Sequence, residues 1–226
     1  MNNETLLRRL ESVKAQGIYG NELLALISDV KTELLTANMK LTDKQRFKHC
    51  LDLCNKGVNS SRPVLAFTHY EDGNQYFTNS WFAVELHGDD IMKDLPRHDE
   101  PYQFKYHTHT EEDAKRLEYP NIKQVFNVAG TEFEIDFEKL YKFARVNKNV
   151  ETMMFDFNGN ISKVDIKLLL NALTWGNASK GTGTISYRGS EMKPIEIVKS
   201  NGTRIVVCPV RCEKEVSEEL TFKFRG

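Results

Sequence analysis

The stretch that decides the fold runs from Asp165 to Gly176 and reads DIKLLLNALTWG. Asp165 is of a type that caps helices, because its carboxylate accepts hydrogen bonds from free N–H groups of the first turn. Apolar residues then recur at positions 166, 169, 170 and 173, the spacing of one helix face. Gly176 is a typical helix end. The sequence therefore predicts an amphipathic helix that needs a partner surface.

Three short segments after this helix have the composition of β-strands. They are residues 183–187, 195–199 and 204–208, which are rich in β-branched and apolar side chains. Asn201-Gly202, between the last two, is a strong signal for a hairpin. We predict a helix followed by three strands of an antiparallel sheet.

The same order of elements occurs earlier, in residues 42–86. An apolar face is formed by four residues at the i, i+3, i+4, i+7 spacing of a helix: Phe47, Cys50, Leu51 and Cys54. Thr42 and Gln45 match a capping box, so we expect the helix to begin there. Residues 63–68, 75–78 and 81–86 are predicted strands, with a tight turn at Asp72-Gly73. This repeated α-β-β-β unit predicts an α+β fold with helices on one face of antiparallel sheets.

The segment before these repeats is predicted to be a helical extension. Residues 1–39 carry two apolar stripes at helical spacing, the first formed by Leu6, Leu7, Leu10 and Val13. Asn21 is placed to cap the second helix. We favour a helical hairpin packed on the body over a partner-binding arm. The predicted domains are a helical extension (1–40), module 1 (41–130) and module 2 (131–226). The alternative is one domain over 41–211 with an insertion at about 90–160.

The region between the repeats contains further elements. Residues 132–135 and 152–157 are predicted strands, and Asp136 is placed to cap a helix between them, whose buried face is formed by Phe137, Leu140, Tyr141 and Ala144. Residues 102–108 are expected to form one strand, and residues 111–118 a short helix or a loop. Residues 119–121 read Tyr-Pro-Asn, which indicates a turn.

Composition limits the function classes. Lys and Arg total 31 and Asp and Glu total 32, for a net charge of −1, so any contact with nucleic acid must come from a local basic face. No apolar run approaches the roughly 20 residues that span a bilayer, and we see no signal peptide. We expect a cytoplasmic protein without membrane contact.

Four cysteines form two C-x3-C pairs, a spacing that invites a zinc interpretation: Cys50, Cys54, Cys208 and Cys212. Three of them lie on the predicted helix stripe or in the apolar segment 205–208. Free cysteine behaves as a small buried hydrophobe, so we favour core packing over a metal site. A disulfide is not expected in a reducing compartment. No cofactor is predicted.

Several segments resemble the bacterial sliding clamps, the β subunit-like processivity factors of DNA polymerase III. Residues 164–173 look like the helix that opens the last half-domain of a clamp. Residues 193–197 and 204–211 look like its closing hairpin, with the apolar-Pro-apolar-Arg ending of residues 208–211. Residues 62–65, 77–80 and 119–121 resemble earlier clamp segments. A bacterial clamp subunit has three such domains, and this chain has room for two at most. We interpret it as a divergent phage or mobile-element type.

This resemblance implies a non-catalytic protein that tethers or scaffolds DNA replication proteins on double-stranded DNA. Clamp rings place helices on the inside, where cations meet phosphates without reading sequence. The cations on the predicted helices are Lys44, Lys48, Lys139, Lys142, Arg145, Lys163 and Lys167. An ordinary solvated surface is the competing interpretation. Ring closure implies a homo-oligomer, for instance a head-to-tail trimer of two-module chains.

The resemblance also implies a pocket for peptides of replication proteins. The matching residues are Cys208, Pro209, Val210 and Arg211. In this chain a tail follows, and residues 220–224 alternate like a strand. Such a tail is placed either to cover the pocket or to add an edge strand.

Two alternatives stay open. One is a clamp-fold interaction module that does not encircle DNA. The other is a metal-dependent hydrolase using His107 and His109, which we expect on one side of a strand, with Glu111 or Asp113 as a further ligand. Neither a P-loop nor a dinucleotide-binding glycine motif occurs. We therefore predict a protein that is not an enzyme.

Overall fold

The computed structural model describes residues 5, 8, 9, 11–13, 17, 20–126, 129–211 and 218–224. The chain forms two compact units. We call the first, Met1–His69 with Met92–Tyr119, the helical unit. The second, Tyr70–Ile91 with Pro120–Gly226, is the sheet unit. The first repeat is divided between the units, whereas the second lies wholly in the sheet unit.

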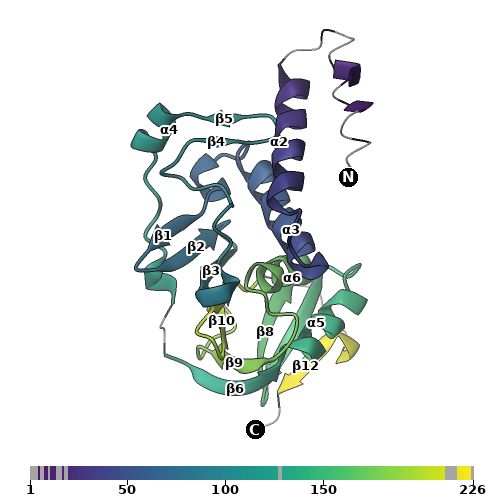
Figure 1. Ribbon diagram of the computed structural model, residues 1–226. Helices are drawn as coiled ribbons and strands as arrows, with labels where there is room; N and C mark the ends of the chain where they lie inside the picture. The colour runs from purple at the N-terminus through teal and green to yellow at the C-terminus, as the bar shows by residue number, and fades with distance from the viewer. Residues whose placement is uncertain are drawn as a thin grey trace. The chain divides into compact units, whose positions relative to one another are not determined.

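The helical unit contains α2, α3, a small hairpin and α4 (Figure 1). Their bounds are α2 Asn21–Leu35, α3 Leu41–Gly57, η1 Pro63–Ala66, β4 Tyr102–Gln103, β5 Thr108–His109 and α4 Glu111–Arg116. α3 packs against η1 and turns Phe47, Cys50 and Cys54 into the core. The apolar stripe predicted for α3 is therefore confirmed.

Four local predictions in this unit are wrong. Residues 63–66 form a 3-10 helix instead of a strand, since Pro63 at its first turn lacks an N–H for a ladder. Residues 102–108 are not one strand but parts of the β4–β5 hairpin. α2 begins after Gly20, whose φ of 92° suits glycine, so Asn21 is not its cap. α3 begins at Leu41 without a side-chain cap, so Thr42 lies within its first turn.

Two further expectations have different outcomes. Residues 111–116 form a helix, α4, which begins with a capping box between Thr110 and Asp113. Leu6, Leu7 and Leu10, which define the stripe of the first predicted helix, lie outside the described residues.

The sheet unit is built on a seven-stranded sheet with the order β1-β2-β3-β11-β10-β9-β6. The bounds are β1 His69–Glu71, β2 Asn74–Thr78, β3 Phe82–Leu86, β6 Thr131–Asp136, β9 Thr182–Tyr187, β10 Ile195–Lys199 and β11 Arg204–Val207. All pairings from β2 to β6 are antiparallel. The meander β1–β3, whose first strand was predicted at 63–68, therefore joins the predicted meander β9–β11 edge to edge through β3 and β11, where Ile205 lies opposite Val84. The predicted α+β class is confirmed.

One face of this sheet is covered by α6, Ile166–Trp175. The indole of Trp175 stacks on the ring of Phe77 with 3.8 Å between centroids. A Cβ on Gly176 would come 2.3 Å from Cδ1 of Ile205, so a larger residue there would force the Ile205 side chain to shift. α5, Phe137–Val146, packs beside α6. The predicted caps are confirmed, because Asp136 accepts from the N–H of Lys139, and Asp165 from that of Leu168.

A second, three-stranded sheet has the order β12-β7-β8. Its bounds are β7 Thr152–Phe157, β8 Asn160–Asp165 and β12 Thr221–Phe224. The strand β8 was missed from sequence because its apolar residues are Ile161 and Val164, which lie three positions apart and do not alternate. β12 pairs with β7 in parallel, so the tail adds an edge strand. No helix in the described part of the chain is long and apolar enough to cross a bilayer.

Candidate DNA and partner interface

The two candidate cations on α3 share one carboxylate of the helical unit. Lys44 Nζ lies 3.0 Å from Oε2 of Glu33 on α2, and Lys48 pairs with Oε1 of the same residue. The hydrogen bond from Lys48, helped by Lys44, outweighs burial and lowers the pKa of Glu33 to about 2. Part of the positive charge on this face of α3 is therefore neutralised by α2.

α5 of the sheet unit carries the most exposed candidates. Lys139 and Lys142 have side chains 78% and 71% exposed, and Arg145 is exposed as well. Lys142 pairs with Glu138 at 2.7 Å, a contact that raises the pKa of Lys142. Lys139 lies 3.9 Å from Asp136. Positions 139, 142 and 145 follow the i, i+3 rule, so these three cations share one solvent face.

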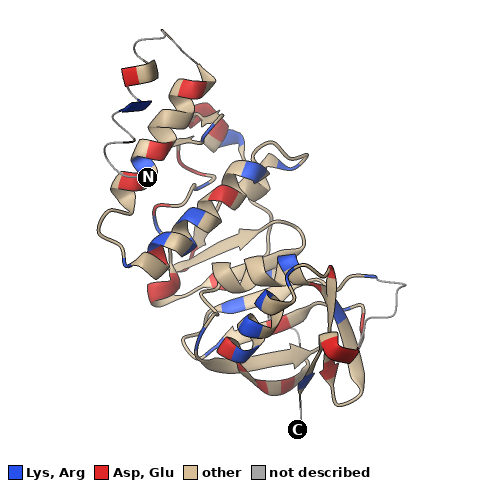
Figure 2. Ribbon diagram, turned by 90° about the vertical axis from the view of Figure 1, so that its right-hand side faces the viewer, with Lys and Arg blue, Asp and Glu red and all other residues tan. Residues whose placement is uncertain are grey.

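The remaining cations lie on neighbouring elements. Lys167 is exposed in the first turn of α6. The prediction that Lys163 lies on a helix is wrong, because this residue is half-buried on the strand β8. α6 contacts both α5 and β8, so five of the seven predicted cations belong to three elements that pack together. Lys167 is the one basic residue within α6. Figure 2 shows that basic and acidic positions are interspersed over both units.

The predicted partner-binding residues follow directly after β11. The backbone N–H of Cys208 donates to the Trp81 carbonyl at 2.9 Å, and that of Val210 donates to the Lys163 carbonyl at 2.9 Å. Cys208, Pro209 and Val210 are half-buried, and Arg211 is exposed. The segment therefore bridges the start of β3 and the edge of β8.

Trp81 lies beside the predicted partner-binding residues and was not predicted from the sequence to be part of this site. Its side chain is 56% exposed although its backbone is bound to residue 208. Burial raises the pKa of the adjacent Cys208 thiol, which favours its neutral form. The available signal was a large aromatic residue directly after the Asn79-Ser80 turn. The segment 208–211 is itself mainly apolar, with the charged Arg211 at its end.

The candidate metal ligands have different surroundings. His109 is 3% exposed, its Nε2 lies 2.9 Å from the His98 carbonyl, and its ring packs on Phe67. His107 precedes β5 and is exposed. Over the residues described, no group of three or more His, Cys, Asp or Glu side chains is arranged to hold a metal. The expectation that both histidines lie on one side of a strand is therefore wrong, because the side chain of His109 is buried in the core and that of His107 is exposed to solvent.

The cysteines that the structure describes are unbonded: Cys50, Cys54 and Cys208. Cys50 and Cys54 are fully buried on α3, and burial raises the pKa of the Cys50 thiol to about 12. Both are therefore neutral core residues at physiological pH. Cys212 lies outside the described residues.

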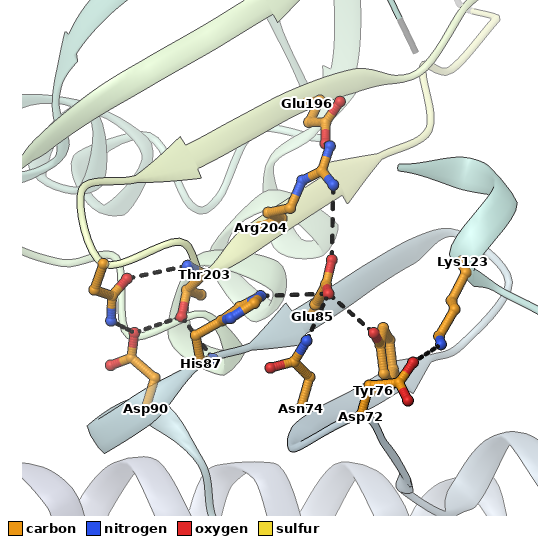
Figure 3. Close-up of polar contacts among 11 residues, drawn as sticks. Asp72, Asn74, Tyr76, Glu85, His87, Asp90, Lys123, Glu196, Thr203 and Arg204 are labelled. Atoms are coloured by element: carbon orange, nitrogen blue, oxygen red, sulfur yellow. Dashed lines mark hydrogen bonds and ion pairs between the residues drawn. The ribbon is translucent and has the colours of Figure 1, made fainter. Parts of the chain in front are cut away.

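The joint between β3 and β11 is held by buried polar groups, shown in Figure 3. Asp90, just after β3, accepts from Lys199 and also from Asn201 Nδ2 at 2.7 Å and Thr203 Oγ1 at 2.8 Å. A fourth bond comes from Asn177 Nδ2 at 2.8 Å. Burial alone would raise the pKa of Asp90, but the hydrogen bonds, led by Lys199, lower it. The end of β3 is therefore fixed to the β10–β11 hairpin.

A second set of charges crosses the same joint on the sheet face opposite α6. Arg204 on β11 pairs with Glu196 on β10 and lies 3.8 Å from Glu85 on β3. Arg188 donates to Glu196 at 2.7 Å, with both side chains 4% exposed. Tyr76 donates to Glu85 at 2.9 Å. We call these residues, together with Asp90 and its partners, the joint network.

Comparisons with known proteins give a likeness in structure only. No protein-family model matches the chain, and no curated protein sequence matches it. The chain is similar to the β subunit of DNA polymerase from Streptococcus pyogenes (TM-score 0.49, 11% identity, 73% of this chain, 64% of that one). It is also similar to the sliding clamp of Bacillus subtilis (TM-score 0.47, 13% identity, 72% and 63%). A third similar structure is the Helicobacter pylori β clamp in complex with diflunisal (TM-score 0.49, 11% identity, 76% and 64%).

The chain spans slightly less than two thirds of the length of these proteins.

Proposed function

We propose that this chain is a non-catalytic, sliding-clamp-like scaffold that holds double-stranded DNA and replication proteins. The observation that carries the proposal is the edge-to-edge joining of two three-stranded meanders into one antiparallel sheet, with α6 on one face. Such a sheet can continue from one module to the next and leaves helices available for another surface. The proposed repeating parts are residues 41–130 and 131–226, in a closed homo-oligomer.

The proposed DNA contacts are the cations of the sheet unit. Lys139, Lys142 and Arg145 share the exposed face of α5, and Lys167 lies on the adjoining α6. Contacts of this kind are electrostatic, so binding should weaken steeply with salt and depend little on sequence. Lys44 and Lys48 contribute less, because Glu33 neutralises part of their charge.

The proposed site for replication proteins is the segment 208–211 together with Trp81. Its half-buried apolar residues and exposed indole suit an apolar peptide. The basic Arg211 lies at the exposed end of this proposed site, where its charge favours an acidic residue in the bound peptide.

Retention on closed circular DNA tests this function. A ring remains on circular DNA in moderate salt but slides off linear DNA of the same sequence. We expect the triple variant Lys139→Glu, Lys142→Glu, Arg145→Glu to lower DNA affinity at low salt at least tenfold. The matched control is Lys93→Glu, Lys115→Glu, Arg116→Glu, which changes the same charge at exposed positions of the helical unit. Equal loss in both triples, or no preference for circular DNA, would contradict the proposal.

A second candidate is a clamp-fold interaction module that does not encircle DNA. Two observations favour it: α6 carries one basic residue, and the α3 cations are paired with Glu33. This candidate predicts a monomer at high concentration, no salt-dependent retention on DNA, and intact binding of a partner through Trp81. Mass measurement in solution therefore separates the two functions.

A further inference from the structure

The tail strand β12 (Thr221–Phe224) binds the rest of the sheet unit in the way that an extended peptide ligand binds the edge of a sheet. It pairs in parallel with β7, with Phe222 opposite Phe155 and Phe224 opposite Phe157. A parallel pair cannot be closed by a tight hairpin turn, so β12 is not part of a local unit with β7. Its place is at the edge of the three-stranded sheet. Addition of an extended segment to a sheet edge is a recurring mode of peptide binding.

Alternate side chains of the tail fill an aromatic surface. The ring of Phe224 stacks on Phe157 with 4.8 Å between centroids and also lies 5.8 Å from Phe133. Phe222 meets Phe155 at 6.2 Å and Phe143 on α5 at 5.6 Å. Phe155 and Phe157 are fully buried, and Phe224 is 6% exposed. Withdrawal of the tail would therefore expose two phenylalanines at an open strand edge, which calls for a replacement.

The contacts that hold the tail do not depend on covalent linkage to the same chain. They are ladder hydrogen bonds and ring contacts, and the Lys223 ammonium pairs with Glu218 of the tail itself at 2.7 Å. Among the described residues, Thr221 Oγ1 is buried and has no hydrogen-bond partner, which makes docking of the tail slightly less favourable. The tail of any other copy offers the same side chains in the same register.

We propose that β12 docks on β7 of a second copy of this chain, so that copies are linked by exchange of their tails. The occupant follows from the chemistry of the site, because the aromatic surface fits an extended segment with phenylalanines two residues apart, and the tail supplies that spacing. Exchange replaces each contact in one chain by the identical contact between chains.

Disulfide trapping in the full-length chain tests the exchange. Lys223 and Asp156 lie opposite each other in the ladder, at the strand spacing that suits a disulfide. One copy carries Lys223→Cys and another carries Asp156→Cys, and the two are mixed under mild oxidation. We expect a covalent dimer of the two different copies, identified by mass, that is suppressed by excess synthetic peptide of residues 218–226.

Two controls give every outcome a meaning. A chain that carries both cysteines must form the disulfide, either within one chain or between two copies, which verifies the register, and the absence of the disulfide in both forms overturns the proposal. Lys193→Cys, at an exposed position in the loop before β10, replaces Lys223→Cys in the matched mixture and measures chance encounters. A mixed dimer no more abundant than this background, with internal closure intact, shows that the tail docks only within its own chain and also overturns the proposal.

Discussion

The two sheets of the sheet unit are completed in different ways. The seven-stranded sheet is closed at β3–β11 by the joint network, in which Asp90 alone accepts four hydrogen bonds. The three-stranded sheet is completed by β12, whose side chains offer ring contacts to β7. Both are strand pairings of similar length. They differ in their side-chain contacts, which are hydrogen bonds and ion pairs at β3–β11 and aromatic ring contacts at β12–β7.

This difference in chemistry indicates that the β3–β11 pairing is permanent, whereas the β12–β7 pairing can be exchanged. Buried charges and amides need their own partners at fixed positions, since an unpaired buried group costs far more than a pair gains. A shift of β11 against β3 would break several such pairs at once. Aromatic packing on β7 tolerates replacement, because an identical ring from another chain can make the same ring contacts. The joint network therefore specifies the body, and the tail is the exchangeable part.

The largest effect is expected at Asp90. Asp90→Ala removes the acceptor of four hydrogen bonds and leaves Lys199 buried without its partner, which costs about 4 kcal/mol of unfolding free energy. Urea denaturation measures this change. Asp89→Ala, at the exposed neighbouring position, is the control and should stay within about 0.5 kcal/mol of the wild type. Similar values for the two variants would show that the joint is not held by this network.

The next effect concerns the tail. Phe224→Ala removes the ring stacked on Phe157 and should weaken tail docking by about 3 kcal/mol, so amides of residues 222–224 exchange roughly 100-fold faster. The β10–β11 amides should keep their protection. Lys223→Ala, on the solvent side of the same strand, serves as the control. Equal loss of protection across both sheets would mean that the tail is an integral part of the body.

A smaller effect is expected from acid. The pKa of Asp90 in the folded chain is lowered, so its stabilisation is fully present above the ordinary pKa near 3.8 and is lost as pH falls through the lowered value. Unfolding free energy should therefore drop more steeply below pH 4 in the wild type than in Asp90→Asn. Protection of the tail amides, measured relative to the body, should change little over the same range. A parallel slope in both proteins would contradict this assignment.

The smallest effect should come from Thr221→Val. This change removes a buried hydroxyl without a partner and keeps the shape of the side chain. Docking of β12 should become tighter by about 1 kcal/mol, which slows amide exchange in the tail roughly fivefold. Because the tail is the same in either docking form, the variant should not shift the balance between internal and exchanged docking. Faster exchange in the variant would indicate that the hydroxyl has a partner after all.

Local signals predicted much of the sheet unit. Asp136 and Asp165 cap their helices because a carboxylate before an apolar stripe has nearby N–H groups to accept from, wherever the helix packs. Asn201-Gly202 likewise gives a hairpin, with Ile197 opposite Ile205. The prediction at residues 63–66 failed because a short apolar run with a leading proline fits either a strand or a 3-10 helix.

The candidate site was less predictable than the fold. Sequence identifies Lys44 and Lys48 as cations opposite an apolar stripe, but the pairing with Glu33 depends on where α2 packs. The exposed indole of Trp81 next to Cys208 depends on strand order, since 127 positions separate the two residues along the chain.

By itself the sequence determined the apolar faces of α3, α5 and α6 and the meander β9–β11, because hydrophobic period, caps and turns act over a few neighbouring residues. Only the tertiary structure decided that β3 meets β11, that Asp90 holds this joint, and that the tail lies parallel to β7. These contacts join residues far apart in the chain. Their choice rests on the burial and pairing of whole surfaces, which no local pattern encodes.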